Sequence, residues 1–302
     1  MTELPWRVLI AGCGYVGTAL GLLLCERGHR VWGLRRNAGA LPFPIHPLSA
    51  DLLCLGDVSR VPRGLTHVVY AAAPDGPSDA QYFQAYVAGL GNLLALDPLR
   101  SAQFRQLLLV SSTAVYGPTE GDWVDEQTPP DAQDFAGQRL LQSEALLRRS
   151  GLPHTIFRCA GIYGPGRGRL IRMARGTEPV SQPALQRFTN RIHRDDVCGA
   201  IAHLLERPPR SQVYLGVDHE SARLGDVLGW LRGQLGLPAE ITPSAAGEPS
   251  RRARSSRRCR GTKLRESGYR FIYPTFREGY ARLLAYPSAL GFGPTGDRSR
   301  LG

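Results

Sequence analysis

The sequence predicts an α/β protein in which a doubly wound parallel sheet is followed by a smaller C-terminal lobe. Strand-like apolar runs occur at residues 8–11, 31–34, 68–72, 107–110 and 155–158, with helix-like periodic segments between most of them. Such alternation is typical of a parallel sheet that helices cover on both faces. A spaced set of three glycines follows the first run directly, and it strengthens the same prediction.

Composition supports a large folded core. The chain has 302 residues, of which 42% are hydrophobic, and this is enough for one large domain or two unequal lobes. No apolar run approaches the roughly 18 residues that span a bilayer, and the first residues do not resemble a secretion signal. Six cysteines are scattered without a Cys-x-x-Cys pair, as is usual for reduced thiols. We therefore expect a soluble, cytoplasmic protein without a membrane partner or a metal site.

The first predicted strand runs into Gly12-x-Gly14-x-x-Gly17 and then into an apolar helix. Gly12 allows a tight turn, Gly14 lets a pyrophosphate approach the backbone, and Gly17 lets the helix pack close to the strand. The phosphates are expected on the free N–H groups at the helix start, at Tyr15 and Val16. This arrangement predicts a dinucleotide site of the Rossmann type.

Further helices are expected at residues 15–27, ending before Gly28, and at 81–96, 137–149, 196–206 and 224–235. From Gly164 onwards glycine, proline and arginine accumulate and the alternating pattern loosens. We therefore expect a dinucleotide-binding domain over residues 1–163, a substrate lobe over 164–285 and a flexible tail over 286–302. Residues 187–216 are expected to return to the first domain.

The end of the second strand predicts which dinucleotide binds. NAD sites usually carry an acidic residue there for the ribose 2′-hydroxyl, whereas this chain has Arg35 and Arg36. Two guanidiniums suit a 2′-phosphate, so NADP is favoured over NAD, although one of the two arginines alone could be a solvated loop residue. Asp51 is a candidate for the adenine amine or a simple turn residue, and Ala71 and Ala72 are expected to line the same site.

The net charge of +11 is unevenly distributed, with six arginines in residues 251–260, and Lys263 is the sole lysine. Nucleic-acid binding would call for aromatic platforms or a groove-entering helix, and the cluster shows neither. Arg167, Arg169 and Arg258 in the later region instead suit an anionic small-molecule substrate. The alternative for each arginine is a solvated loop.

Several blocks resemble the extended short-chain dehydrogenases/reductases, in their NAD-dependent epimerase/dehydratase branch. Residues 109–117 read Leu-Val-Ser-Ser-Thr-Ala-Val-Tyr-Gly, residues 162–166 read Ile-Tyr-Gly-Pro-Gly, and residues 192–197 read Ile-His-Arg-Asp-Asp-Val. The segment 264–279 extends the likeness to atypical bacterial members. The resemblance implies a nucleotide-sugar-like substrate and allows a homodimer, since long helices often pair subunits in this family.

In that family an Asn, a Ser or Thr, a Tyr and a Lys form the active site, and the lysine makes the phenol a usable acid or base. Ser112 falls on the hydroxyl position, but Tyr86 replaces the asparagine. The Tyr-x-x-x-Lys pair would fall on Ala136 and Leu140 or, shifted by one, on Phe135 and Arg139, and neither register contains a tyrosine.

Two explanations remain for a chain that keeps the cofactor motif and lacks the acid/base pair. Another residue performs the proton transfer, with Tyr86, Tyr116, Tyr163, His193 and Asp195 as candidates, although for each of them a structural role is favoured over a catalytic one. Alternatively, the protein is a non-catalytic NADP(H)-sensing or interaction protein. We expect an epimerase/dehydratase or reductase with Ser112 and Tyr86 in its site.

Overall fold

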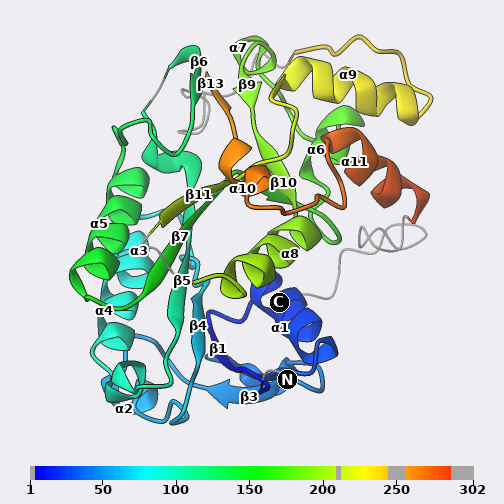
Figure 1. The fold of residues 1–302 in the computed structure, drawn as a ribbon. Helices are drawn as coiled ribbons and strands as arrows, with labels where there is room; N and C mark the ends of the chain where they lie inside the picture. Colours follow the sequence, from blue (N-terminus) through cyan, green and yellow to red (C-terminus); the bar gives the residue numbers. More distant parts are fainter. Residues whose placement is uncertain (1–3, 118, 209–211, 244–255, 287–302) are drawn as a thin grey trace.

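The computed structural model describes residues 4–117, 119–208, 212–243 and 256–286, and its centre is a parallel sheet (Figure 1). In this part of the chain the sheet has seven strands in the order β11-β7-β5-β4-β1-β2-β3. Every neighbouring pair runs parallel. The strands are β1 (Arg7–Ala11), β2 (Arg30–Arg35), β3 (His46–Ser49), β4 (His67–Tyr70), β5 (Gln106–Ser112), β7 (His154–Cys159) and β11 (Gln212–Gly216).

Helices cover both faces of the sheet, which confirms the doubly wound α/β prediction. α1 (Tyr15–Glu26) and α8 (Arg194–Leu205) lie on one face, and α3 (Asp79–Phe83), α4 (Gly89–Leu94) and α5 (Phe135–Arg149) lie on the other (Figure 1). Val8 and Ile10 of β1 join the core beneath α1 and α8, whereas Leu9 and Ala11 join the core beneath α4 and α5. Strands buried on both faces read as continuous apolar runs for this reason.

The segment predicted as one helix over 81–96 is interrupted. A π-helical turn, η2 (Gln84–Ala88), separates α3 from α4. The Tyr70 hydroxyl donates to the Ala85 carbonyl oxygen at 2.5 Å, and a Cβ on Gly89 would lie 2.8 Å from the same hydroxyl oxygen. A side chain that enters the helical hydrogen-bond ladder in this way is a known cause of such irregularities, which often occur at functional sites.

The small lobe has its own core, formed by α6 (Arg169–Ala174), α7 (Gln182–Leu185), α9 (Leu224–Gln234) and α11 (Phe276–Ala285). β7 leads directly into β8 (Gly161–Tyr163), so the lobe lies at the carboxyl ends of the sheet strands (Figure 1). Short ladders complete it: β8 with β10 (Arg191–His193), β9 (Phe188–Thr189) with β12 (Ala222–Arg223), and β6 (Glu120–Val124) with β13 (Ser256–Cys259). The remaining short helices are η1 (Ala38–Ala40), α2 (Leu55–Val58), η3 (Asp97–Arg100), η4 (Thr113–Val115) and α10 (Thr262–Glu266).

The later region contributes to the large domain as well as to the lobe. β11 pairs with β7 at the edge of the central sheet, and Cys198 of α8 donates its thiol to the Val16 carbonyl oxygen of α1 at 3.7 Å. Residues 287–302 of the expected tail lie outside the described residues. In the described ranges, no helix is long and apolar enough to cross a membrane.

Candidate dinucleotide site

The order of the sheet places a ligand site beside β1. The chain adds β2 and β3 on one side of β1 and then returns to β4 on the other side. In open α/β sheets, ligands bind at the carboxyl ends of the strands where the order reverses in this way. The residues that follow β1 and β4 are therefore the first to consider, and they include the glycines and alanines that the sequence singled out.

Gly12 makes the closest approach at this switch point. Its φ is +85°, and a Cβ there would lie 2.3 Å from the Ala72 nitrogen and 2.7 Å from the Ala71 carbonyl carbon. No side chain fits into such a backbone-to-backbone contact. Glycine is thus required both by the positive φ and by the neighbouring strand end.

The other two glycines of the motif lie in different surroundings. A Cβ on Gly17 would lie 2.9 Å from Ile10 Cγ2 and 3.0 Å from the Gly12 carbonyl oxygen, so this glycine lets α1 pack closely on β1. A Cβ on Gly14 would meet nothing within 4 Å. The backbone at Gly14 therefore faces open space, which leaves room for a ligand.

The N-terminus of α1 offers backbone N–H donors that no side chain caps. Its first turn has no acidic residue. The first N–H groups of a helix, including those of Tyr15 and Val16, have no intrahelical acceptor, and the helix dipole makes this end positive. An uncapped start beside an open glycine fits the pyrophosphate of a dinucleotide.

A hollow of about 660 Å³ runs along α1 from this end, a volume in the range of small-molecule sites. It brings together three of the predicted cofactor residues, Gly14, Tyr15 and Arg35, with Arg194 and Asp195 at the start of α8. The rest of its lining comes from α1, namely from the half-buried Thr18, Ala19, Leu22 and Leu23 and from the exposed Glu26.

Arg36 and Asp51 do not belong to the lining of this hollow. Both terminal nitrogens of Arg36 donate to the Asp75 carboxylate, at 2.5 and 2.9 Å, and both side chains are exposed. An exposed pair of this kind contributes about 0–1 kcal/mol, so the pairing of Arg36 with Asp75 is weak. Asp51 Oδ1 accepts a hydrogen bond from the Leu53 N–H at 2.9 Å. This is the geometry of a turn residue, the alternative to the predicted contact of Asp51 with the adenine amine.

Ser112 ends β5, at the same edge of the sheet. Its hydroxyl oxygen accepts from the Ala114 N–H at 3.2 Å and so caps η4. Among the described residues, no acceptor takes the Ser112 hydroxyl hydrogen, so it can donate to a ligand. Ser112 lies opposite Cys159 in the β5–β7 register, close to the entry into the lobe.

Neither predicted register supplies a cation beside the substrate position. Arg139 donates to both oxygens of Asp79 on α3, at 2.7 and 2.8 Å, and to Gln142 Oε1 at 2.8 Å. Leu140 is buried in a core cluster with Val115 and Tyr116. In either register, the place of the family lysine is filled by structural contacts.

The chain also matches known proteins. A model described as the NAD dependent epimerase/dehydratase family matches residues 8–215. The chain belongs to this family. It is an NAD-binding protein of the extended short-chain dehydrogenase/reductase type.

Among the relatives of this epimerase/dehydratase-family chain is the Escherichia coli K12 protein YeeZ, 29% identical over 222 residues that cover 69% of this chain and 76% of YeeZ. The human epimerase family protein SDR39U1 is 26% identical, with 92% of this chain and all of that protein covered. A solved structure from Methylobacillus flagellatus, assigned to the NAD-dependent epimerases/dehydratases, has a TM-score of 0.78 at 36% identity, covering 94% and 100% of the two chains.

A further solved structure shares the fold at lower identity. The dTDP-glucose 4,6-dehydratase DesIV of Streptomyces venezuelae, determined with NAD and TYD bound, has a TM-score of 0.78 at 21% identity and covers 94% of this chain and 98% of its own. At this identity the likeness shows the fold alone.

Two tyrosines of the family motifs are structural here. The Tyr116 hydroxyl donates to the Asp125 carbonyl oxygen at 2.6 Å and accepts from Arg158 at 2.9 Å. Burial raises the pKa of Tyr116 to about 12, so its phenol is a poor base at neutral pH. Tyr163 is buried and stacked on Tyr280, and burial raises its pKa as well. Tyr86, in the π-helical turn, is half-buried beside the cluster around Val115.

A buried ion pair behind Ser112 was not anticipated from the sequence. Arg158 donates to both oxygens of Glu144, at 2.9 and 2.7 Å, and the Ser111 hydroxyl donates to the same carboxylate at 2.8 Å. Arg158 is 3% exposed and Glu144 is fully buried. This network joins α5, β5 and β7, and it fixes the strand end that presents Ser112.

Asp196, in the block 192–197, anchors the lobe. Its buried carboxylate accepts from the N–H groups of Ile272 and Tyr273, at 2.7 and 3.0 Å, and from the Tyr269 hydroxyl at 2.9 Å. The segment that leads into α11 is thereby tied to the start of α8, which lies next to the dinucleotide helix.

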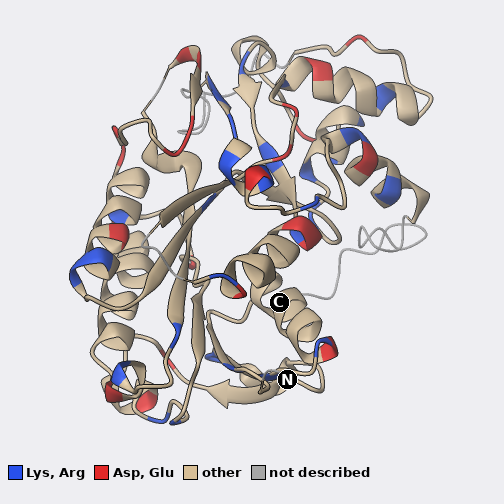
Figure 2. Ribbon diagram, viewed as in Figure 1, with Lys and Arg blue, Asp and Glu red and all other residues tan. Residues whose placement is uncertain are grey.

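The arginines predicted to bind substrate lie in three different settings. Arg169 is exposed and pairs with Glu178 at 3.2 Å, whereas Arg167 lies over the Tyr15 ring. Arg258 donates to the Gly121 carbonyl oxygen at 2.6 Å and stacks on Trp123 and Phe188. Arg251, Arg252 and Arg254 of the cluster lie outside the described residues. Basic and acidic residues are interspersed on the lobe helices in Figure 2.

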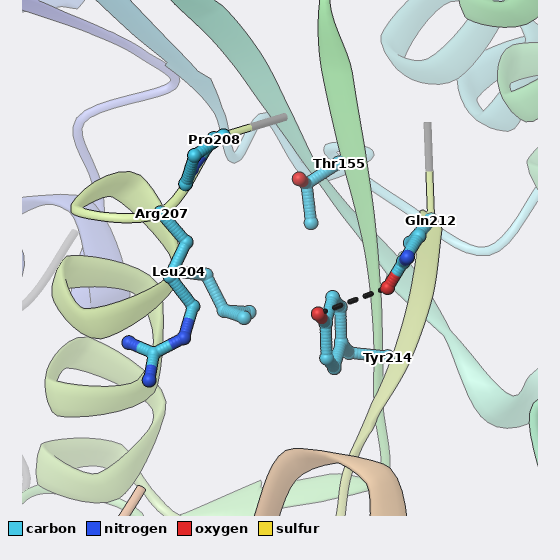
Figure 3. Close-up of a pocket in the computed structure, with 6 residues that line it drawn as sticks. All are labelled: Thr155, Leu204, Arg207, Pro208, Gln212 and Tyr214. Atoms are coloured by element: carbon cyan, nitrogen blue, oxygen red, sulfur yellow. Dashed lines mark hydrogen bonds between the residues drawn. The ribbon is translucent and has the colours of Figure 1, made fainter. Parts of the chain in front are cut away.

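A second hollow carries no site. Figure 3 shows six residues around it, among them Thr155, Leu204 and Arg207. The Tyr214 hydroxyl there donates a hydrogen bond to Gln212 Oε1 at 3.1 Å. Its volume is about 10 Å³, room for about one water, and it lies at the amino ends of β7 and β11. Over the described ranges, no group of three or more His, Cys, Asp or Glu side chains could hold a metal ion.

Proposed function

We propose that this chain binds NADP at the glycine turn and acts as an epimerase/dehydratase or reductase on an anionic, nucleotide-sugar-like substrate. The observation that carries the proposal is the uncapped start of α1, where Gly14 faces open space in a hollow that Arg35 also lines. An anion placed there meets free N–H groups and the positive end of a helix.

The arginines after β2 support NADP over NAD. Arg35 lines the hollow, and the exchangeable pairing of Arg36 with Asp75 leaves a second guanidinium for a 2′-phosphate. Charge-assisted, bidentate hydrogen bonds of this type are among the strongest that a protein makes. DesIV, a neighbour in fold, was determined with NAD, and the cofactor preference of this chain rests on its own two arginines.

A nicotinamide bound in the site would accept or donate hydride. In the proposed reaction, the Ser112 hydroxyl donates a hydrogen bond to the substrate oxygen, because its own oxygen is already engaged by the Ala114 N–H. Tyr86 is the candidate proton donor, since it occupies the family asparagine position in an irregular helical turn. Without a neighbouring lysine its phenol is a weak acid/base group, and turnover is expected to be slow.

The activity test is NADPH oxidation with a panel of carbonyl compounds and nucleotide sugars. Removal of one positioned hydroxyl costs about 10²-fold to 10³-fold in kcat, so Ser112→Ala should reduce turnover to that extent. Tyr86→Phe should also abolish most of it, whereas Tyr82→Phe, on the neighbouring helix 5.7 Å away ring to ring, should leave it unchanged. Equal rates for the wild type and Ser112→Ala would contradict the assigned role of Ser112.

A second function is favoured by the contacts of α5. Because Arg139 is held by Asp79 and Leu140 is buried, the chain suits a non-catalytic protein that senses NADP(H) and presents a surface to a partner. Saturable NADPH binding without oxidation by any compound of the panel would favour this reading. Turnover that depends on Ser112 or Tyr86 would reject it.

A further inference from the structure

Two guanidiniums converge on Tyr15, the first residue of α1. The Arg167 Cζ lies 4.1 Å from the centroid of the Tyr15 ring, and the Arg194 Cζ lies 5.4 Å from it. Arg194 begins α8, and Arg167 belongs to the lobe. Cations over an aromatic face are attracted to it, and this contact uses none of the guanidinium N–H donors.

The lobe turn that carries Arg167 is seated directly on Tyr15. The Arg167 N–H donates to the Gly164 carbonyl oxygen at 3.0 Å, which closes a tight turn after β8. Gly164 has φ +147°, and a Cβ on it would lie 2.9 Å from the Tyr15 hydroxyl oxygen and 3.4 Å from His193 Nε2. Arg167, His193 and Tyr15 are thus brought to one place from three elements.

Two buried polar atoms at this place lack a partner. The Tyr15 hydroxyl oxygen and His193 Nε2 make no hydrogen bond within the described ranges. His193 is 2% exposed, and its Nδ1 accepts from the Asp195 N–H at 3.2 Å. Burial lowers the pKa of His193 to about 4, so the neutral ring carries its proton on Nε2, as a donor. Buried donors without partners are rare, and each calls for an explanation.

The charge around these donors is positive. Asp195 pairs with Arg194 at 2.8 Å, and within the described ranges Arg167 has no ion pair. The uncapped N-terminus of α1 adds its own partial positive charge. A ligand that satisfies two guanidiniums and two neutral donors at a helix start has several negatively charged oxygens, as a pyrophosphate does.

We propose that Arg167, Arg194, Tyr15 and His193 form a phosphate-binding cluster that holds the pyrophosphate of the dinucleotide from the lobe side. The inference rests on the proposed dinucleotide binding and extends it. It moves Arg167 from the substrate, where the sequence placed it, to the cofactor. The lobe would then be tied to the bound dinucleotide through the turn at Gly164, and cofactor binding would order the substrate side of the site.

The test is isothermal titration calorimetry with NADP and, separately, with uridine diphosphate as a probe of the substrate phosphates. A charge-assisted pair lost from a site costs about tenfold to hundredfold in affinity, so Arg167→Ala should weaken NADP binding by that factor. Arg167→Lys keeps the charge and loses the fork geometry, so its NADP affinity should lie between those of the wild type and Arg167→Ala. Arg169→Ala is the matched control, because Arg169 lies two residues away and pairs with Glu178, and its NADP affinity should be unchanged.

Each outcome bears on the cluster. Equal NADP affinity of the wild type and Arg167→Ala, with both folded by thermal unfolding, would overturn the cluster and leave the proposed function standing. Weaker uridine diphosphate binding with unchanged NADP binding would assign the cluster to the substrate and overturn its link to the cofactor. A wild type that binds neither NADP nor NAD would overturn both proposals.

Discussion

Replacing Gly12 with alanine is expected to destabilise the fold by about 3 kcal/mol or more and to abolish dinucleotide binding. The added Cβ would lie 2.3 Å from the Ala72 nitrogen and 2.4 Å from its Cα. Backbone atoms cannot rotate away as a flexible side chain can, so β1 and β4 would have to separate at the switch point. Overpacking typically costs 1–3 kcal/mol, to which the left-handed backbone adds 1–2 kcal/mol.

Gly28 offers a matched control for this prediction. Its φ is +84°, within a degree of the +85° of Gly12, but a Cβ on it would meet nothing within 4 Å. Gly28→Ala therefore measures the backbone strain alone, about 1–2 kcal/mol. Chemical denaturation of both variants separates the two effects. If Gly12→Ala cost no more than Gly28→Ala, the close contact of Gly12 with the end of β4 would be wrong.

Replacing Glu144 with alanine is expected to destabilise the protein by about 3–5 kcal/mol, because it leaves a buried arginine without its counter-charge. Both oxygens of Glu144 receive hydrogen bonds from Arg158, which is 3% exposed. The Ser111 hydroxyl loses its acceptor in the same variant. The end of β5 should loosen with the network, so dinucleotide-dependent activity should fall together with stability.

Arg148→Ala provides the comparison for Glu144. Arg148 pairs with the same carboxylate at 3.1 Å, but its side chain is 45% exposed, and exposed pairs at this spacing contribute about 0.3–0.5 kcal/mol. The loss of stability in Glu144→Gln should lie between those of Glu144→Ala and Arg148→Ala, because glutamine keeps the shape of the side chain and loses its charge. If urea denaturation showed that Glu144→Ala lowers the free energy of unfolding by less than about 1 kcal/mol, the prediction would be wrong. Arg158 would then find water or another acceptor in place of Glu144.

The sequence predicted the parts of the fold that repeat a simple pattern. β1, β2, β4, β5 and β7 are buried on both faces and read as apolar runs. β3 and β11 were not among these runs, because they are the two edge strands and are only partly buried. β3 (His46–Ser49) contains a histidine, a proline and a serine and has no fully buried residue, so its pairing with β2 leaves no hydrophobic pattern to read.

Contacts between distant segments account for the rest. The π-helical turn η2 accepts a hydrogen bond from the Tyr70 hydroxyl, which lies on strand β4. No local pattern in residues 81–96 predicts this contact. The partners of Arg139 and Arg158 lie 60 and 14 residues away, at Asp79 and Glu144. The glycine motif is different, because the tight turn at Gly12 and the close helix packing at Gly17 are local contacts that the spacing alone predicts.

The glycine turn at Gly12 to Gly17 is proposed to bind NADP in preference to NAD. The most direct test is calorimetric titration of the wild-type chain with both dinucleotides, alongside a double variant in which Arg35 and Arg36 are alanine. We predict one NADP per chain, bound about tenfold to hundredfold more tightly than NAD, with the preference lost in the double variant, since charged hydrogen bonds to the 2′-phosphate are removed. No saturable binding of either dinucleotide, or tighter binding of NAD, would contradict the claim.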